Sequence, residues 1–285
     1  MHVWAPGAFD LVMPEDVGFP IGSEGFKSFR VEIHYDNPKR KVGVIDNSKL
    51  RLFLTNTPRA HNAGIMHMGD PLVMLGRASS KVTATPGNNA ISTWDFECPT
   101  SCTKNILSLE QNITVFKEIL HMHKAGSRMV QTHFRDGEIL RENFVDYYDF
   151  NSAGGIAILQ KPYEVMAGDS FKTSCTYQSS GGKVFFGLSS DDEMCITYLM
   201  YYPALTSKES QDIYCGAYST NSNCEGALNM KSQRQLDHIF GTPCEKDITV
   251  DSEQNVPPQS SSSLISTAKL FVIGSFMIAL WNLHS

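Results

Sequence analysis

The sequence has 285 residues and a mass of 31.7 kDa, with 41% hydrophobic, 10% aromatic and 19% charged residues. This is enough chain for one large or two ordinary domains with a buried core, and the composition excludes a disordered, collagen-like or coiled-coil protein. Lys and Arg number 24 against 30 Asp and Glu, a formal net charge of −6. Because the chain is acidic and carries no basic stripe, we expect no nucleic-acid partner.

Runs of alternating apolar and polar residues recur along the chain and predict β-strands. In the first run, residues 29–35, the apolar side chains would share one face and His34 would lie on the other. The further candidate strands are residues 49–54, 113–120, 129–134, 184–186 and 195–200. Many short strands without a long amphipathic helix predict an all-β fold, an antiparallel sandwich or jelly roll.

The C-terminal part changes composition twice. Residues 217–263 are rich in Ser, Asn and Gln and predict a poorly ordered linker. Residues 264–283 are mostly apolar and include Lys269. This stretch fits a membrane-spanning helix of about twenty residues, a lipid-anchor signal that is cleaved off, or a buried terminal helix. We expect it to attach the chain to a membrane.

The chain has seven cysteines, an odd number, so at least one has no partner within the chain. Cys98 and Cys102 form the only close pair, and this spacing without a second pair argues against zinc and favours disulfides. Asn112-Ile113-Thr114 is an N-glycosylation acceptor triplet. These features together predict a secretory-pathway protein that is extracellular or luminal.

His121 and His123 follow a predicted strand and are separated by one residue. Residues two apart on a strand point to the same side, so the two imidazoles could chelate a metal. Met194 lies among acids at the head of another predicted strand. Two imidazoles and a thioether form a soft site suited to copper. Taken singly, such residues more often lie on the surface or fill the core.

Several short motifs identify a family by their order and spacing. The motifs are Trp4–Gly7, Ile33–Pro38, Asn62–Met66, Leu120–His123, Phe134–Glu138, Gly168–Asp169, Cys175–Tyr177, Asp192–Cys195 and Tyr201–Pro203. By these motifs the chain resembles, from Trp4 to Cys215, the copper type II, ascorbate-dependent monooxygenases, the family of dopamine beta-hydroxylase.

This resemblance implies two jelly-roll domains that hold one copper each. His121, His123 and Met194 would bind the oxygen-activating copper, and His34 would be one of three histidines on an electron-transfer copper. Ascorbate would reduce both coppers, and dioxygen would hydroxylate an activated C–H bond. The family's disulfides would correspond to Cys98–Cys215 and Cys175–Cys195, and Cys102 would pair with Cys224 or Cys244.

The sequence departs from the family at the first copper site. The family supplies two ligands of that site from adjacent histidines, and this sequence contains no such dipeptide. We interpret residues 1–42 as the remnant of the first domain of a truncated chain and residues 43–216 as a complete second domain. Such a chain would bind about one copper and hydroxylate poorly. The alternative is a non-catalytic, membrane-tethered β-sandwich.

The substrate is partly indicated by the resemblance. Ile119 and Ile196 stand where peptide-hydroxylating members place an arginine and an asparagine, which argues against a peptide substrate. His67 stands where amine-hydroxylating members carry an acid, which argues against a catecholamine. Tyr198 would line the substrate pocket. We expect a small amine or aromatic substrate, and we interpret His133 as a structural or surface histidine.

Overall fold

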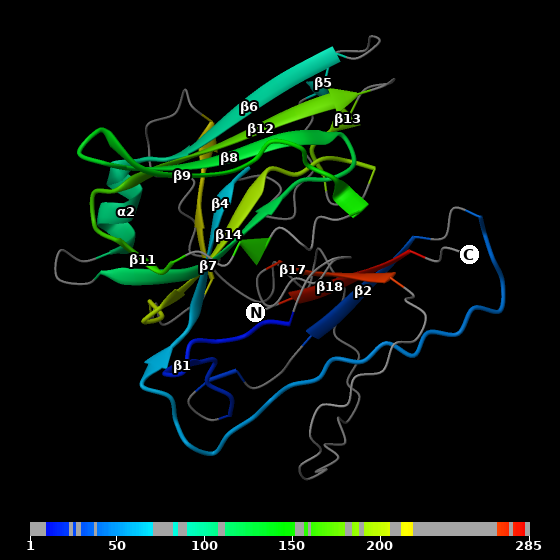
Figure 1. Cartoon of the computed structure of the whole chain (residues 1–285), viewed down its shortest axis with the longest axis horizontal. Helices are drawn as coiled ribbons and strands as arrows, with labels where there is room; N and C mark the ends of the chain where they lie inside the picture. The colour runs from blue at the N-terminus through cyan, green and yellow to red at the C-terminus, as the bar shows by residue number, and fades with distance from the viewer. Residues whose placement is uncertain are drawn as a thin grey trace.

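The computed structural model describes most of the chain between residues 10 and 218 and two short C-terminal stretches. The described residues are 10–22, 25–26, 30–36, 39–70, 82–84, 90–107, 112–151, 157–158, 161–179, 184–187, 191–205, 212–218, 267–273 and 276–282. Their regular structure is almost entirely β-strand (Figure 1). This confirms the predicted all-β class.

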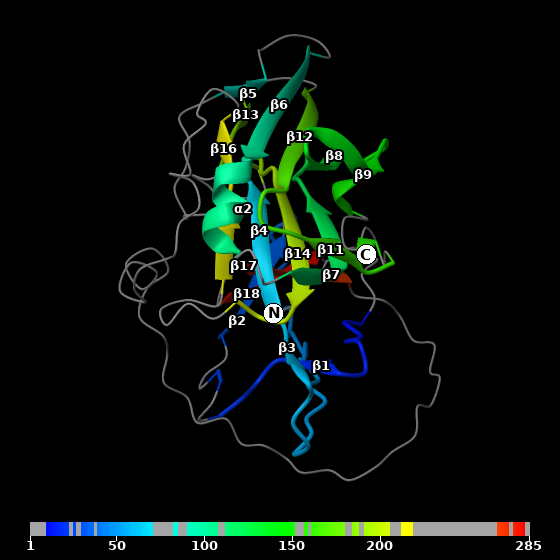
Figure 2. The ribbon, with the colours of Figure 1, turned by 90° about the vertical axis from the view of Figure 1, so that its left-hand side faces the viewer.

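Two sheets pack face to face as a sandwich (Figures 1 and 2). The first sheet contains, in spatial order, β10 (Ala157–Ile158), β7 (Ile113–His121), β14 (Ile196–Tyr202), β4 (Gly64–Gly69) and β15 (Asp212–Cys215), with β11 (Tyr163–Val165) beside β7. The second contains β16 (Ala217–Tyr218), β6 (Ala90–Cys98), β12 (Ser170–Ser179), β8 (Gly126–Arg135) and β9 (Glu138–Val145). All neighbouring strands in these sheets are antiparallel except β4 and β15.

Smaller elements surround the sandwich. The short helix α2 (Thr100–Ile106) lies at one end of it (Figure 2). Two pairs of short strands are β1 (Val17–Gly18) with β3 (His61–Asn62) and β5 (Val82–Ala84) with β13 (Val184–Phe185). A separate three-stranded sheet contains β17 (Thr267–Ile273), β18 (Phe276–Asn282) and β2 (Arg30–Asp36).

The apolar C-terminal tail therefore contributes two strands. In the part of the chain that the structure describes, no helix is long and apolar enough to cross a membrane.

Most predicted strands are present, but residues 49–54 form none. They belong to an extended connection, residues 39–60, which runs along the lower side of the molecule in Figure 1. Phe53 is 87% exposed and Leu54 is 65% exposed. The prediction was wrong because alternation alone cannot make a strand, whose backbone groups need a hydrogen-bonding neighbour.

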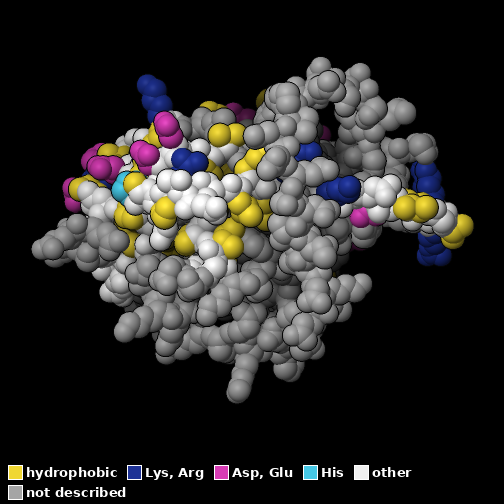
Figure 3. All heavy atoms as spheres, turned by 90° about the horizontal axis from the view of Figure 1, so that it is seen from below, with side chains coloured by type: hydrophobic (Ala, Val, Ile, Leu, Met, Phe, Trp, Pro, Cys, Tyr) yellow, Lys and Arg dark blue, Asp and Glu magenta, His cyan; other side chains and the backbone are white. Residues whose placement is uncertain are grey.

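Seen from below, hydrophobic side chains share the surface with charged ones (Figure 3).

The two faces of the first sheet have different neighbours. On one face, Met66, Met68 and Leu199 pack with Phe171 of the second sheet in the sandwich core. The opposite face contributes to another hydrophobic cluster, which includes Val17 and packs against further residues of the N-terminal segment. This cluster also includes Phe96, Met129 and Tyr177 of the second sheet, and its members from the first sheet are Ile65, Phe116, Ile119, Leu120, Ile196, Tyr198 and Met200.

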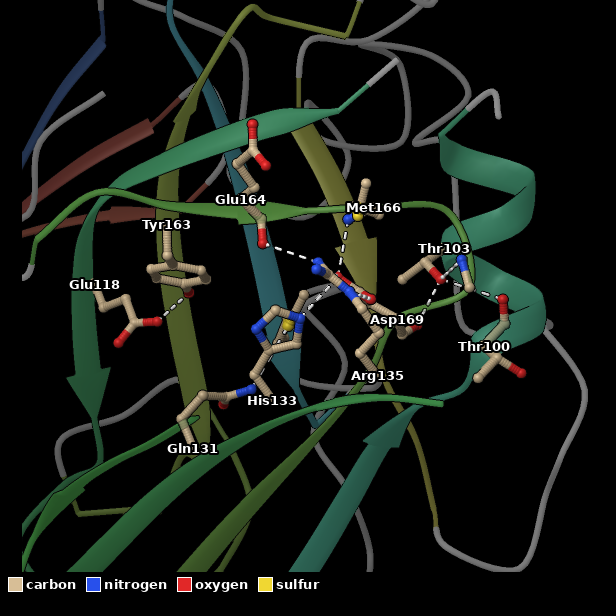
Figure 4. A network of polar contacts seen from close by, with 12 residues as sticks. Thr100, Thr103, Glu118, Gln131, His133, Arg135, Tyr163, Glu164, Met166 and Asp169 are labelled. Atoms are coloured by element: carbon tan, nitrogen blue, oxygen red, sulfur yellow. Dashed lines mark hydrogen bonds and ion pairs between the residues drawn. The ribbon is translucent and has the colours of Figure 1, made fainter. Parts of the chain in front are cut away.

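A buried polar network joins α2 to the sandwich (Figure 4). The Asp169 carboxylate is 2.8 Å from Nε2 of His133 and accepts two hydrogen bonds from Arg135, at 2.7 and 2.9 Å. The Asp169 carbonyl accepts a hydrogen bond from the hydroxyl of Thr103 in α2. His133 also stacks on Phe171, with ring centroids 4.4 Å apart. His133 is therefore a buried structural residue.

Burial and hydrogen bonding together determine the protonation states of His133 and Asp169. Burial lowers the pKa of His133, and the hydrogen bond with Asp169 opposes that shift only in part. For Asp169 burial acts to raise the pKa, but hydrogen bonds from Arg135, Met166 and His133 outweigh it and lower the pKa. The folded protein thus holds a neutral imidazole against a charged carboxylate.

This network predicts a loss of stability in mild acid. Below an unfolded pKa of about 6.5 the unfolded chain protonates His133 while the folded protein does not, so acid favours unfolding by at most about 1.4 kcal/mol per pH unit. His133→Gln should flatten the decline of the unfolding temperature between pH 7 and pH 5. The exposed His61 offers a matched control, and His61→Gln should keep the wild-type profile. An unchanged slope in His133→Gln would contradict the assignment.

Candidate metal site

The pairing of two strands brings together the segments that carry the three predicted copper ligands. His121 is the last residue of β7 and pairs with Ile196, the first residue of β14. His123 lies two residues after His121 and Met194 two residues before Ile196, so an extension of the same antiparallel register would place them opposite each other and on the same face. All three predicted ligands are at most 3% exposed.

The two imidazoles are close, with ring centroids 5.1 Å apart. Nδ1 of His123 is 2.9 Å from the carbonyl oxygen of Asp192. Because a carbonyl only accepts, Nδ1 must carry the proton, which leaves the Nε2 lone pair available for a metal. Burial, and then the nearby His123, hold the pKa of His121 well below its usual value. His121 is therefore in the neutral form that metals bind.

The donor set fits copper(I). In the described residues, no group of three or more His, Cys, Asp or Glu side chains is arranged to hold a metal. A site at His121 and His123 therefore depends on the Met194 thioether as its third donor. Soft sulfur with two imidazoles is a combination that suits copper(I), and zinc seldom uses a thioether.

Several long-range contacts fix the loop that carries Met194. The buried Glu193 carboxylate accepts hydrogen bonds from the backbone N–H groups of His123, at 2.9 Å, and Ala125, at 2.5 Å. The Tyr177 hydroxyl donates to the carbonyl of Met194 at 2.8 Å. Burial raises the pKa of Glu193 to about 7, although three backbone hydrogen bonds oppose the rise.

The next residue, Cys195, is fixed on both sides. It forms a disulfide with Cys175 of β12, and its carbonyl accepts a hydrogen bond from the N–H of Asp70 at 2.9 Å. Gly69 permits this approach because its φ is +130° and a Cβ there would lie 1.9 Å from the carbonyl oxygen. The start of β14 is thereby held between β4 and the second sheet.

Tyr148 holds the residue between the two histidines. Its hydroxyl accepts from the N–H of Met122 at 3.0 Å and donates to the carbonyl of Met122 at 2.7 Å. Sequence reasoning missed Tyr148, Tyr177 and Glu193 as supports of the site. Glu193 and Tyr177 lie within the motifs Asp192–Cys195 and Cys175–Tyr177, whereas no motif includes Tyr148.

Two further polar side chains continue the same face. Tyr198 pairs in register with His67, and their rings meet edge to face with centroids 5.0 Å apart. The Tyr198 ring is also 6.2 Å from that of His121. Burial lowers the pKa of His67 to about 3 and raises the pKa of Tyr198. His67 and Tyr198 form a wall beside the candidate metal ligands, and both side chains are therefore neutral in the folded protein.

The remaining predicted residues are placed separately. His34 lies in β2, but its side chain is outside the described part of the structure. Asn112 is exposed immediately before β7. Ile119 and Ile196 are buried beside the site.

The disulfides Cys98–Cys215 and Cys175–Cys195 are both formed. Cys102 is also disulfide-bonded, and its partner lies outside the described residues. The predicted partners of Cys102, Cys224 and Cys244, both fall in that undescribed part.

Comparisons with known proteins decide the family. The model of the copper type II ascorbate-dependent monooxygenase C-terminal domain matches residues 62–225, and that of the N-terminal domain matches residues 1–42. The chain belongs to this family.

Three relatives illustrate the similarity. Tyramine beta-hydroxylase of Caenorhabditis briggsae is 32% identical over 204 residues, covering 70% of this chain and 33% of the relative. Dopamine beta-hydroxylase of Canis lupus familiaris is 36% identical over 207 residues, covering 71% of this chain and 32% of the relative. DBH-like monooxygenase protein 1 of Homo sapiens is 32% identical over 211 residues, covering 72% of this chain and 33% of the relative. The chain thus spans about a third of the length of these relatives.

The disulfide beside Met194 should support both the fold and the site. Replacing Cys175 and Cys195 with serine removes a cross-link between residues 20 apart in sequence. By the chain-entropy estimate this lowers the free energy of unfolding by about 3 kcal/mol. Thermal and urea unfolding would measure the change. Since Cys195 adjoins Met194, we also expect weaker copper(I) binding, and undiminished stability would contradict the prediction.

Proposed function

We propose that this chain carries the oxygen-activating copper centre of a copper- and ascorbate-dependent monooxygenase. The observation that carries the proposal is that the buried His121 and His123 rings lie 5.1 Å apart at the end of β7, while the buried Met194 lies two residues before the β14 residue that pairs with His121. Family membership supports the same metal and the same reductant.

In the proposed reaction, one oxygen atom of dioxygen enters a C–H bond and the other leaves as water, while ascorbate provides two electrons and two protons. Copper, when bound, would supply the redox chemistry that activates dioxygen. His121, His123 and Met194 would hold the metal, and their burial would keep bulk water away from the reacting groups. Asp192 would keep the His123 ring in the required tautomer.

We propose a small amine or aromatic substrate that contacts Tyr198. The Tyr198 hydroxyl is buried and has no hydrogen-bond partner among the described residues, so a polar group of a substrate could bind it. Ile119 and Ile196 make the neighbouring surface apolar. The names of two relatives identify tyramine and dopamine as substrates of those enzymes.

One observation favours a second candidate function, a non-catalytic β-sandwich that binds at most one copper. The sequence contains no adjacent pair of histidines, which leaves His34 as the single expected ligand of the electron-transfer copper. We therefore propose that the chain binds one copper at His121, His123 and Met194. Without a second metal, delivery of the second electron would be slow and turnover poor.

Copper titration tests the metal site. The full chain should bind one equivalent of copper(I) in competition with a chromophoric chelator. His121→Ala and His123→Ala should abolish tight binding, because each removes one of three ligands. Met194→Leu should weaken copper(I) more than copper(II), since it removes the soft donor at nearly constant volume. His61→Ala is the control, and two tightly bound coppers or insensitivity to His121→Ala would contradict the proposal.

Product analysis on the same preparations separates the two candidate functions. Copper-loaded protein, ascorbate and tyramine should yield slow formation of a product one oxygen atom heavier by mass spectrometry. Loss of that product in Met194→Leu would support the monooxygenase. Copper binding with no ascorbate-dependent product would support the non-catalytic sandwich.

We also propose a domain division and a location for the chain. Residues 1–42 would belong to the first copper domain, residues 43–216 to the second, and residues 217–263 to a linker. Matches to the two family models at residues 1–42 and 62–225 support this division. The disulfides and the apolar composition of residues 264–283 support a secreted or luminal chain attached to a membrane by its C-terminal segment.

Expression in secretory cells tests the location. We expect the full chain to carry a glycan that an N-glycosidase removes and that Asn112→Gln prevents, because Asn112 is exposed. The chain should sediment with membranes, and deletion of residues 264–283 should release it. Ser92→Ala, at a site outside any acceptor triplet, should leave the glycan in place. An unglycosylated chain, or one that stays soluble with its tail intact, would contradict this prediction.

A further inference from the structure

Glu193 lies between the two segments of the candidate metal site, the end of β7 with His121 and His123 and the segment that carries Met194. It is 1% exposed and directly precedes Met194. Its carboxylate reaches across to the turn after β7, where it accepts from the backbone N–H groups of His123 and Ala125. A carboxylate that accepts from two backbone donors can fix one segment against another.

The backbone of Glu193 is held as well. Its N–H donates to the carbonyl of Phe185 at 2.7 Å, and its carbonyl accepts from the N–H of Gly187 at 3.0 Å. The Glu193 side chain therefore projects from an anchored segment and is not a loop side chain free to follow the turn. The Glu193 carboxylate thus links the turn to the residue that directly precedes Met194, beside the contacts of His123 with the Asp192 carbonyl and of Lys124 with Asp191.

We propose that Glu193 is a positioning residue for the copper site. Its two hydrogen bonds hold the thioether of Met194 opposite the imidazoles and keep the Asp192 carbonyl within reach of Nδ1 of His123. This inference rests on the proposed copper site at His121, His123 and Met194. In this proposal Glu193 does not contact the metal, but the bond between copper and the Met194 sulfur depends on it.

The alternative is that Glu193 serves the fold alone. In that case its loss would lower stability and leave copper binding unchanged in the protein that remains folded. A positioning role predicts instead that the two imidazoles, which belong to β7 and its turn, still bind copper while the thioether is lost. Residues that orient metal ligands typically contribute 10–100-fold to metal affinity.

The experiment uses the full chain and copper(I) in competition with a chromophoric chelator. Glu193→Ala should weaken copper(I) binding roughly 10–100-fold. Glu193→Gln should weaken it less, because the amide keeps one acceptor oxygen but turns a donor toward the other N–H. X-ray absorption of the bound copper(I) should show the sulfur contribution reduced in Glu193→Ala. Circular dichroism would verify folding, and Glu193→Gln decides the question if Glu193→Ala does not fold.

Asp191→Asn is the matched control. Asp191 lies in the same loop and also carries a negative charge, but its side chain is 85% exposed and bonds to the Lys124 amine at 2.8 Å. Asp191→Asn should change copper(I) affinity less than twofold. An equal loss in Asp191→Asn and Glu193→Gln would mean that loop charge, not positioning, is responsible, and would overturn the inference.

A double-variant cycle completes the test. If Glu193 acts by placing Met194, then Glu193→Ala should have a much smaller effect on copper(I) affinity once Met194→Ala has removed the thioether. The inference would be overturned if the loss of copper(I) affinity in the double variant equalled the product of the losses in the two single variants. It would also be overturned if both Glu193 variants kept the wild-type copper(I) affinity and the wild-type sulfur signal. If the wild-type chain binds no copper(I) or shows no sulfur ligand, the proposed copper site itself is wrong.

Discussion

The antiparallel pairing of β7 with β14 is the interaction on which the rest of the site depends. It places His121 opposite Ile196, and an extension of that register would place Met194 opposite His123. A slip of one residue would turn Met194 to the face opposite the imidazoles, since side chains alternate along a strand. Pairing with β4 on the other side of β14 helps to prevent such a slip, because Ile196 is also in register with Gly69.

Covalent and polar links connect the two sheets to each other and α2 to the sandwich. Near the candidate metal site, the Cys175–Cys195 disulfide joins the start of β14 to the second sheet. Elsewhere, Cys98–Cys215 joins β6 to β15 and the Asp169 network joins α2 to β8. The links near the candidate metal site hold the segment that carries Met194, whereas the Asp169 network supports the fold.

Sequence patterns predicted what depends on local geometry and missed what depends on distant contacts. The shared side of His121 and His123 followed from the two-residue period of a strand. Tyr148 and Tyr177 support the site from positions 26 and 17 residues away from their partners, and no local pattern marks such contacts. The failure at residues 49–54 has the same cause, because whether an alternating run becomes a strand depends on a neighbour that the run does not contain.

The wall beside the candidate copper site bears on the choice between an amine and an aromatic substrate. His67 and Tyr198 are neutral in the folded protein and present ring edges and polar atoms. The neutral side chains of His67 and Tyr198 would supply no negative counter-charge to a substrate ammonium. An aromatic ring can pack edge to face on both residues, which supports the aromatic alternative for the substrate proposed to contact Tyr198.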